Sequence, residues 1–102
     1  MVVVVELSVV PLGSGVSVSR LVAEAVKALE EMGLKYQVTP MCTVFEASSV
    51  EEAFKAASGA HEAVFKAGAL RVLTTVKVDE RRDRPRARME EKVESLRRAI
   101  ED

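Results

Sequence analysis

The first stretch of the chain, residues 2–10, constrains the fold more than any other. Successive side chains in a strand point to opposite faces, and one face of this stretch is wholly apolar, carrying Val3, Val5, Leu7 and Val9. The other face is also mostly apolar, but Glu6 and Ser8 lie at its centre. Because β-branched residues favour strands, the pattern predicts a strand at the centre of a sheet, covered on both sides.

The rest of the chain alternates between helical and strand-like patterns. Apolar residues spaced by three and four predict helices from Val18 to Met32 and from Ser48 or Ser49 to Phe65, each followed by a glycine. The segment between them, 34–46, fits two short strands joined near Pro40, and residues 69–78 fit a last strand. This order predicts an α+β, ferredoxin-like βαββαβ fold, whose antiparallel sheet has its first and third strands at the centre.

The C-terminal part departs from this alternation. Residues 79–88 hold five arginines against three acidic residues, a balance of +2, which we interpret as a solvated loop in preference to an anion-binding patch. An additional C-terminal helix follows, with a narrow apolar seam formed by Met89, Val93, Leu96 and Ile100. Such a seam predicts docking on another subunit or across the uncovered face of the sheet.

Composition narrows the class of protein. A length of 102 residues predicts one domain over 1–102, and a net charge of -1 gives no reason to expect a nucleic-acid or membrane partner. No apolar run reaches the roughly 20 residues of a membrane span, and we expect a cytoplasmic location. The strands also lack the exposed aromatic pairs on which ferredoxin-like RNA-binding domains stack bases.

The residues capable of chemistry do not form a catalytic set. Cys42 and His61 are single residues with no partner indicated nearby; we interpret Cys42 as a small buried thiol and favour a core role for His61 over a ligand contact. Multi-thiolate metal binding is excluded, and we expect no metal site and no enzymatic activity. The Gly13–Gly15 loop is either a plain turn or a weak anion site.

Polar side chains in the central strands are more informative. Glu6, Ser8, Thr43 and Glu46 lie mid-strand, where a buried polar group without a partner costs roughly 1–3 kcal/mol. Two interpretations remain open. The glutamates pair with basic residues across a subunit interface, or the four side chains line a small polar pocket for a ligand.

Several motifs together resemble one family. PLGSG at 11–15, TPMCTVFE at 39–46, HE at 61–62 and TTVKVD at 74–79 are similar, in the same order, to the thiamine-binding, YkoF-like family of small proteins. The resemblance covers nearly the whole chain. It implies a ferredoxin-like fold, assembly of single-domain chains into a homotetramer, and binding of thiamine or its hydroxymethylpyrimidine part, with no other cofactor.

The implied ligand suggests specific contacts. An aminopyrimidine offers a ring nitrogen and an exocyclic amine, which hydroxyl and carboxylate groups recognise. The contacts that we hypothesise on this basis are Ser8, Thr43, Glu46 and His61, with Glu6 and Ser14 behind them. The alternative is a structural or regulatory homo-oligomeric protein without a ligand of this class.

Overall fold

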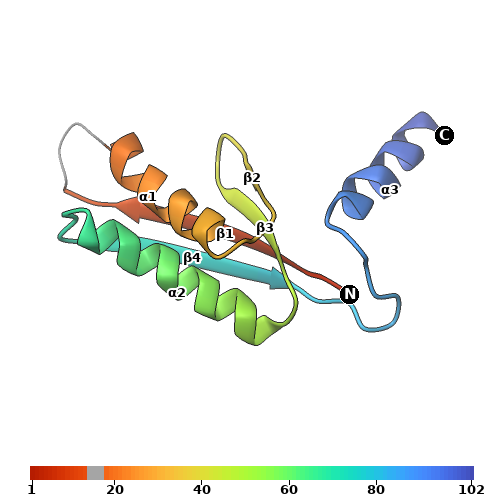
Figure 1. The fold of residues 1–102 in the computed structure, drawn as a ribbon. Coiled ribbons are helices and arrows are strands. Elements are labelled where there is room, and N and C mark those ends of the chain that lie inside the picture. Colours follow the sequence, from red (N-terminus) through yellow and green to blue (C-terminus); the bar gives the residue numbers. More distant parts are fainter. Residues whose placement is uncertain (14–17) are drawn as a thin grey trace.

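The computed structural model describes residues 1–13 and 18–102, and its strands form one four-stranded sheet (Figure 1). All neighbouring strands are antiparallel, in the order β2-β3-β1-β4. This arrangement confirms the ferredoxin-like prediction, with the first and third strands central. Along the chain the elements are β1 (Val3–Pro11), α1 (Val18–Glu31), β2 (Tyr36–Val38), β3 (Thr43–Ala47), α2 (Val50–Lys66), β4 (Val72–Asp79) and α3 (Glu90–Glu101).

The central strand β1 has one buried face and one partly exposed face. The four side chains of its apolar face are at most 6% exposed, and we call this side of the sheet the helix-covered face. On the other side, the open face, Val4 is buried but Glu6 and Val10 are exposed. The prediction that β1 is covered on both sides is therefore met on one side only within a single chain.

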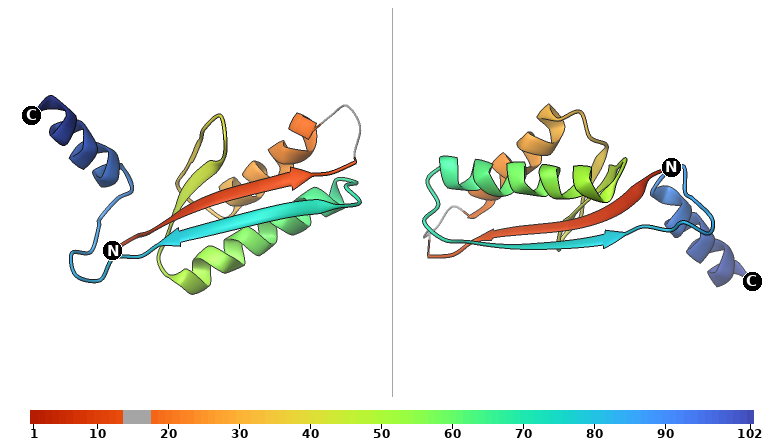
Figure 2. Two further views of the ribbon diagram at one scale, coloured as in Figure 1. Left: turned by 180° about the vertical axis from the view of Figure 1, so that it is seen from behind. Right: turned by 90° about the horizontal axis from the view of Figure 1, so that it is seen from below.

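Helices α1 and α2 lie side by side on the helix-covered face, and the core fills the layer between them and the sheet (Figure 2). Phe45 of β3 and Leu29 of α1 are its largest fully buried side chains. The buried side of α2 consists mostly of alanine: Ala53, Ala56, Ala57, Ala60 and Val64. Protein interiors are close-packed, so a helix whose buried side chains are small lies closer to its neighbours.

The helical spacing of residues 50–65 predicts an apolar stripe, and its two aromatic residues lie at the margins of the buried side of α2. The predicted stripe consists of Val50, Ala53, Phe54, Ala57, His61, Val64 and Phe65. Phe54 is 54% exposed and Phe65 is 36% exposed. The apolar pattern predicts that both phenylalanines face the core, whereas the structure mainly buries the alanines of this helix. The predicted start of this helix is confirmed, since the Ser49 hydroxyl caps it by accepting from the backbone N–H of Glu52 at 3.0 Å.

The C-terminal helix α3 extends away from the sheet in each view (Figures 1 and 2). It does not lie across the open face, which was one of the two predicted positions. Met89, at its beginning, is the only residue of the apolar seam that is buried; Val93, Leu96 and Ile100 are 49–73% exposed. Within the described residues, no helix is long and apolar enough to cross a membrane.

Candidate functional site

The alternation of side chains separates the residues that we expected in one pocket. The sheet register pairs Leu7 with Thr43 and Val4 with Glu46, and residues directly opposite each other share a face. Thr43 therefore lies on the helix-covered face, whereas Glu46 lies with Ser8 on the open face. In the described part of the chain, Ser8 and Thr43 share one cavity, and Glu46 does not line it.

This cavity, which we call the hairpin cavity, has a volume of about 210 Å³. It opens where β3 begins: the pairing of β1 with β3 ends at Leu7 and Thr43, so β1 continues with no described strand beside it on that side. Helix α1 closes the space from the helix-covered face. The lining residues are Leu7, Ser8, Val9, Val10, Val22, Val26, Val38, Thr39, Pro40, Met41, Cys42 and Thr43.

The hydroxyl groups of Ser8 and Thr43 are available to a ligand. Neither makes a side-chain hydrogen bond to another described residue, and no fully buried side-chain polar atom of the described residues lacks a partner. Thr43 is only 9% exposed, so its hydroxyl retains contact with the cavity although the rest of the side chain is buried. The walls of the cavity are thus largely apolar, with Thr43 on the helix-covered face and Ser8 on the open face of β1 as its two hydroxyl residues without a described side-chain partner.

Thr39 fixes the turn that forms one wall of the hairpin cavity. Its hydroxyl donates to the backbone carbonyl of Cys42 at 2.9 Å and accepts from the backbone N–H of Cys42 at 3.1 Å. The Cys42 sulfur lies 3.4 Å from the same hydroxyl and is partly buried, less enclosed than predicted. The sequence analysis missed Thr39; a threonine immediately before a proline in a hairpin turn was the available signal.

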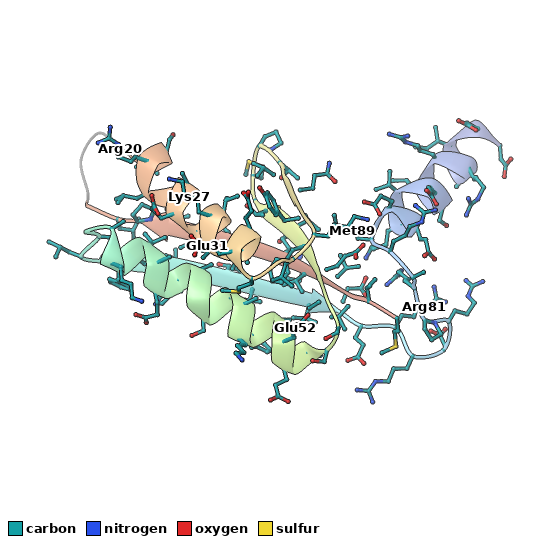
Figure 3. The ribbon with its side chains drawn as sticks, in the orientation of Figure 1. Arg20, Lys27, Glu31, Glu52, Arg81 and Met89 are labelled. Atoms are coloured by element: carbon teal, nitrogen blue, oxygen red, sulfur yellow. The ribbon has the colours of Figure 1, made fainter. Side chains whose placement is uncertain are left out.

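Glu46 binds the start of α3. Its carboxylate accepts a hydrogen bond from the backbone N–H of Met89 at 2.7 Å and pairs with Lys35 at 3.3 Å. Lys35 also donates to Glu90 in the first turn of the helix at 2.6 Å. Because the first N–H groups of a helix lack partners within it, Glu46 acts as a cap supplied by the sheet. Its partner Met89 is labelled in Figure 3 and lies where α3 begins. Glu46 thus pairs with a lysine inside one chain.

We expect Glu46→Ala to loosen the attachment of α3. The variant removes the acceptor for the Met89 N–H and one partner of Lys35, so amide hydrogen exchange at the start of α3 should accelerate while exchange in β1 stays unchanged. Glu24→Ala, which removes the exposed partner of Lys27 in α1, is the matched control. Equal exchange at Met89 in Glu46→Ala and in the unmodified protein would contradict the capping role.

The same attachment should depend on pH. Hydrogen bonds from Lys35 and Lys92 lower the pKa values of Glu90 and Asp79, and the hydrogen bond to Glu90 raises the pKa of Lys35. A lowered carboxyl pKa stabilises the fold above the unfolded value of about 4, and a raised lysine pKa does so below about 10.5. The contact should therefore be strongest between these limits and weaken outside them, as amide exchange over a pH series would show.

Glu6 lines a separate, larger space between the open face and the beginning of α3. This cavity has a volume of about 370 Å³ and mostly apolar walls, including Val4, Val44 and Val93. Glu6 faces Lys77 of β4, its partner in the sheet register. Glu6 and Glu46, which we expected in one ligand pocket, thus make contacts in different places.

His61 lies away from the hairpin cavity, on α2. Its Nδ1 atom is 2.7 Å from the hydroxyl of Thr74 on β4, and its ring packs edge to face on Phe65 at 5.1 Å. The Thr74 hydroxyl thus supplies the hydrogen-bond partner that a histidine packed on the sheet requires. Since β4 and the β2–β3 hairpin are at opposite edges of the sheet, His61 and Cys42 do not form a nucleophile and base.

The remaining candidate, Ser14, lies outside the described residues. Within those that the structure describes, no three His, Cys, Asp or Glu side chains gather closely enough to hold a metal ion. The sequence analysis also missed Lys35, which joins Glu46 to Glu90 across a separation of 55 residues along the chain. No local pattern signals a contact of that range.

Relatives of known sequence are similar over almost the whole chain. A UPF0045 protein from Methanothermobacter thermautotrophicus is 45% identical over 96 residues, covering 93% of this chain and 96% of the relative. The UPF0045 protein YqgV of Bacillus subtilis is 35% identical over 103 residues, covering 96% and 97%. Their names state no activity.

Solved structures share the fold. A hypothetical protein from Methanocaldococcus jannaschii has a TM-score of 0.83 at 36% identity, covering 93% of this chain and 95% of the other. A protein from Thermotoga maritima, named for thiamine biosynthesis or salvage, has a TM-score of 0.78 at 23% identity, covering 94% and 99%; at that identity it supports the fold alone. Residues 5–97 match the family described as thiamine-binding protein. The chain is therefore a member of the thiamine-binding protein family, as its motifs predicted.

Proposed function

We propose that this chain is a non-enzymatic binding protein for thiamine or its hydroxymethylpyrimidine part, acting in the cytoplasm as a homo-oligomer. One observation carries the proposal: Ser8 and Thr43, two hydroxyl residues without described side-chain partners, line one cavity with largely apolar walls. Family membership supplies the class of ligand. Residues 39–43 of the hairpin motif, which carries much of the family resemblance, also form one wall of this cavity.

The chemistry of the cavity suits an aminopyrimidine ring. A hydroxyl both donates and accepts, so Thr43 on the helix-covered face is able to bond a ring nitrogen or an exocyclic amine. Ser8, on the other face, would reach the ring at the edge of β1 that no described strand pairs. Val22 and Val26 of α1 offer apolar contact to the ring. Cavities for drug-sized ligands measure roughly 300–1,000 Å³, so a volume of about 210 Å³ favours entry of the pyrimidine ring alone. The thiazolium part of thiamine would then extend outside.

The set of proposed ligand contacts differs from the set expected from the sequence. Ser8 and Thr43 remain, and Thr39 is added because it lines the same cavity. Glu46 is occupied at the start of α3, Glu6 faces another space, and His61 bonds Thr74. For these three residues we propose no direct contact with the pyrimidine.

Exposed apolar side chains support self-association. Val93, Leu96 and Ile100 form an exposed apolar seam on α3, and Leu73 of the open face is 58% exposed; a contiguous exposed apolar surface such as this seam marks an interaction site. We propose that copies of the chain cover it, with a homotetramer as the expected assembly. The same observation favours the alternative function, a structural or regulatory homo-oligomeric protein without a ligand of the thiamine class.

Chemical-shift mapping tests the location of the ligand. Titration of ¹⁵N-labelled protein with hydroxymethylpyrimidine should shift the amides of residues 8–10, 39 and 41–43 and leave those around His61 unchanged. Saturable shifts confined to α2 and β4 would refute the hairpin cavity as the site. Light scattering on the same sample separates the two parts of the proposal: a mass of 11.1 kDa would contradict self-association without bearing on the cavity.

A further inference from the structure

A strongly basic cavity lies between the β4–α3 connection and α3, and the proposed function does not use it. The space, which we call the basic cavity, has a volume of about 520 Å³. Five cationic side chains line it against two glutamates, a balance of +3, although the whole chain has a net charge of -1. The cations are Arg81, Arg84, Arg86, Lys92 and Arg98, of which Arg81 is labelled on the connection in Figure 3.

The two glutamates of the basic cavity are already engaged. Glu91 accepts from the backbone N–H groups of Ala87 and Arg88, at 2.8 and 3.0 Å, and so caps the start of α3. Glu94 binds the guanidinium group of Arg88 through two hydrogen bonds of 2.7 and 2.9 Å. Glu94 thus pairs with Arg88, which does not line the cavity, and Glu91 is held by backbone N–H groups, while the five cations of the basic cavity still outnumber its two carboxylates by three.

Some cations of the basic cavity are paired with a carboxylate, and others are not. Asp79 pairs with Arg86 and Lys92, and Asp83 pairs with Arg81, whose guanidinium lowers the pKa of Asp83 to about 2. Within the described residues, Arg84 and Arg98 have no carboxylate within ion-pair distance. One comes from the connection and the other from the last turn of α3, and both line the same space.

We propose that the basic cavity binds a phosphoryl group, either inorganic phosphate or the phosphate of a phosphomonoester. Guanidinium groups match the geometry of phosphate oxygens and form charge-assisted hydrogen bonds with them. Arg84 and Arg98 contact the anion, while Arg86, fixed by Asp79 and only 17% exposed, gives the cavity a rigid wall. A nucleic acid is a poorer match, because proteins that bind single strands add aromatic stacking platforms and none of the residues lining this cavity is aromatic.

This proposal revises the interpretation of residues 79–88 as a purely solvated loop. The sequence showed the arginines of the connection but gave no reason to combine them with Arg98, which lies ten residues beyond the segment. The structure brings both around one cavity. The proposal is independent of thiamine binding, since no residue of the hairpin cavity lines the basic cavity.

The test is an NMR titration with inorganic phosphate and, separately, with glycerol 3-phosphate, at constant ionic strength and with chloride as the reference anion. We expect saturable shifts in residues 81–98 that chloride does not produce. Tighter binding of glycerol 3-phosphate would identify a phosphorylated molecule as the preferred source, and equal binding would identify phosphate itself. Arg84→Ala and Arg98→Ala should each weaken binding at least about fivefold, because hydrogen bonds to charged groups are the stronger class.

Arg20→Ala, in an exposed arginine of α1, is the matched control and should bind phosphate normally. Circular dichroism establishes that the variants fold, which we expect because Arg84 and Arg98 make no ion pair in the described structure. Shifts that do not saturate, or an equal loss of affinity in Arg20→Ala, would overturn the proposal. So would an oligonucleotide that binds through Arg84 and Arg98 and is not displaced by phosphate.

Discussion

Thr43→Val should weaken binding of hydroxymethylpyrimidine by roughly five- to tenfold, the range expected for one lost hydrogen bond. Valine keeps the shape of the side chain and replaces the hydroxyl with a methyl group. Because this hydroxyl makes no side-chain hydrogen bond to a described residue, the free energy of unfolding should hardly change. Calorimetric titration measures the affinity, and a thermal melt of the same sample measures stability.

Thr75→Val is the matched control for this experiment. Thr75 is an exposed threonine on β4 and pairs with Ser8 in the sheet register, yet it does not line the hairpin cavity. Its replacement should leave the affinity unchanged. Ser8→Ala should resemble Thr43→Val, and the double variant should lose more than either. Unaltered affinity in the double variant would show that the pyrimidine binds elsewhere.

Phe45→Ala should have the largest effect on stability. Phe45 is fully buried at the centre of β3, within the core formed by β1 and the two helices. Large-to-small replacement of a buried phenylalanine costs about 3–5 kcal/mol, a large share of the roughly 5–15 kcal/mol that stabilises a typical protein. Denaturant unfolding measures the loss as a lower midpoint.

Phe54→Ala is the control for Phe45→Ala, because it removes the same type of side chain from an exposed position. Phe54 is 54% exposed on α2, and surface replacements usually change stability by less than about 0.5 kcal/mol. A loss as large as that of Phe45→Ala would mean that the outer side of α2 is buried in the folded assembly. The pair therefore tests which aromatic residues form the core.

The fold was predictable because its signals are local. The alternation in residues 2–10, the helical spacing after Val18 and the serine cap at Ser49 each act over a few residues, and the structure confirms all three. Phe54 was misplaced for a related reason. Large apolar side chains dominate a helical pattern, whereas the buried side of α2 depends on small alanines that contribute little to it.

The candidate site was less predictable because it depends on strand register. Thr43 and Glu46 are three residues apart on one strand, and strict alternation already places them on opposite faces. The sequence analysis applied this rule to β1 and not to β3. The contact of Glu46 with the start of α3 was not predictable from local sequence patterns, because Glu46 and Met89 are separated by 43 residues along the chain.

Calorimetric titration with thiamine and with hydroxymethylpyrimidine, on protein whose mass is known from light scattering, tests the central claim most directly. We predict saturable binding of both compounds near one per chain, with affinity reduced in Thr43→Val and preserved in Thr75→Val. No heat of binding with either compound, from a folded and assembled sample, would contradict the claim. The interaction-protein alternative would then be the better account of this chain.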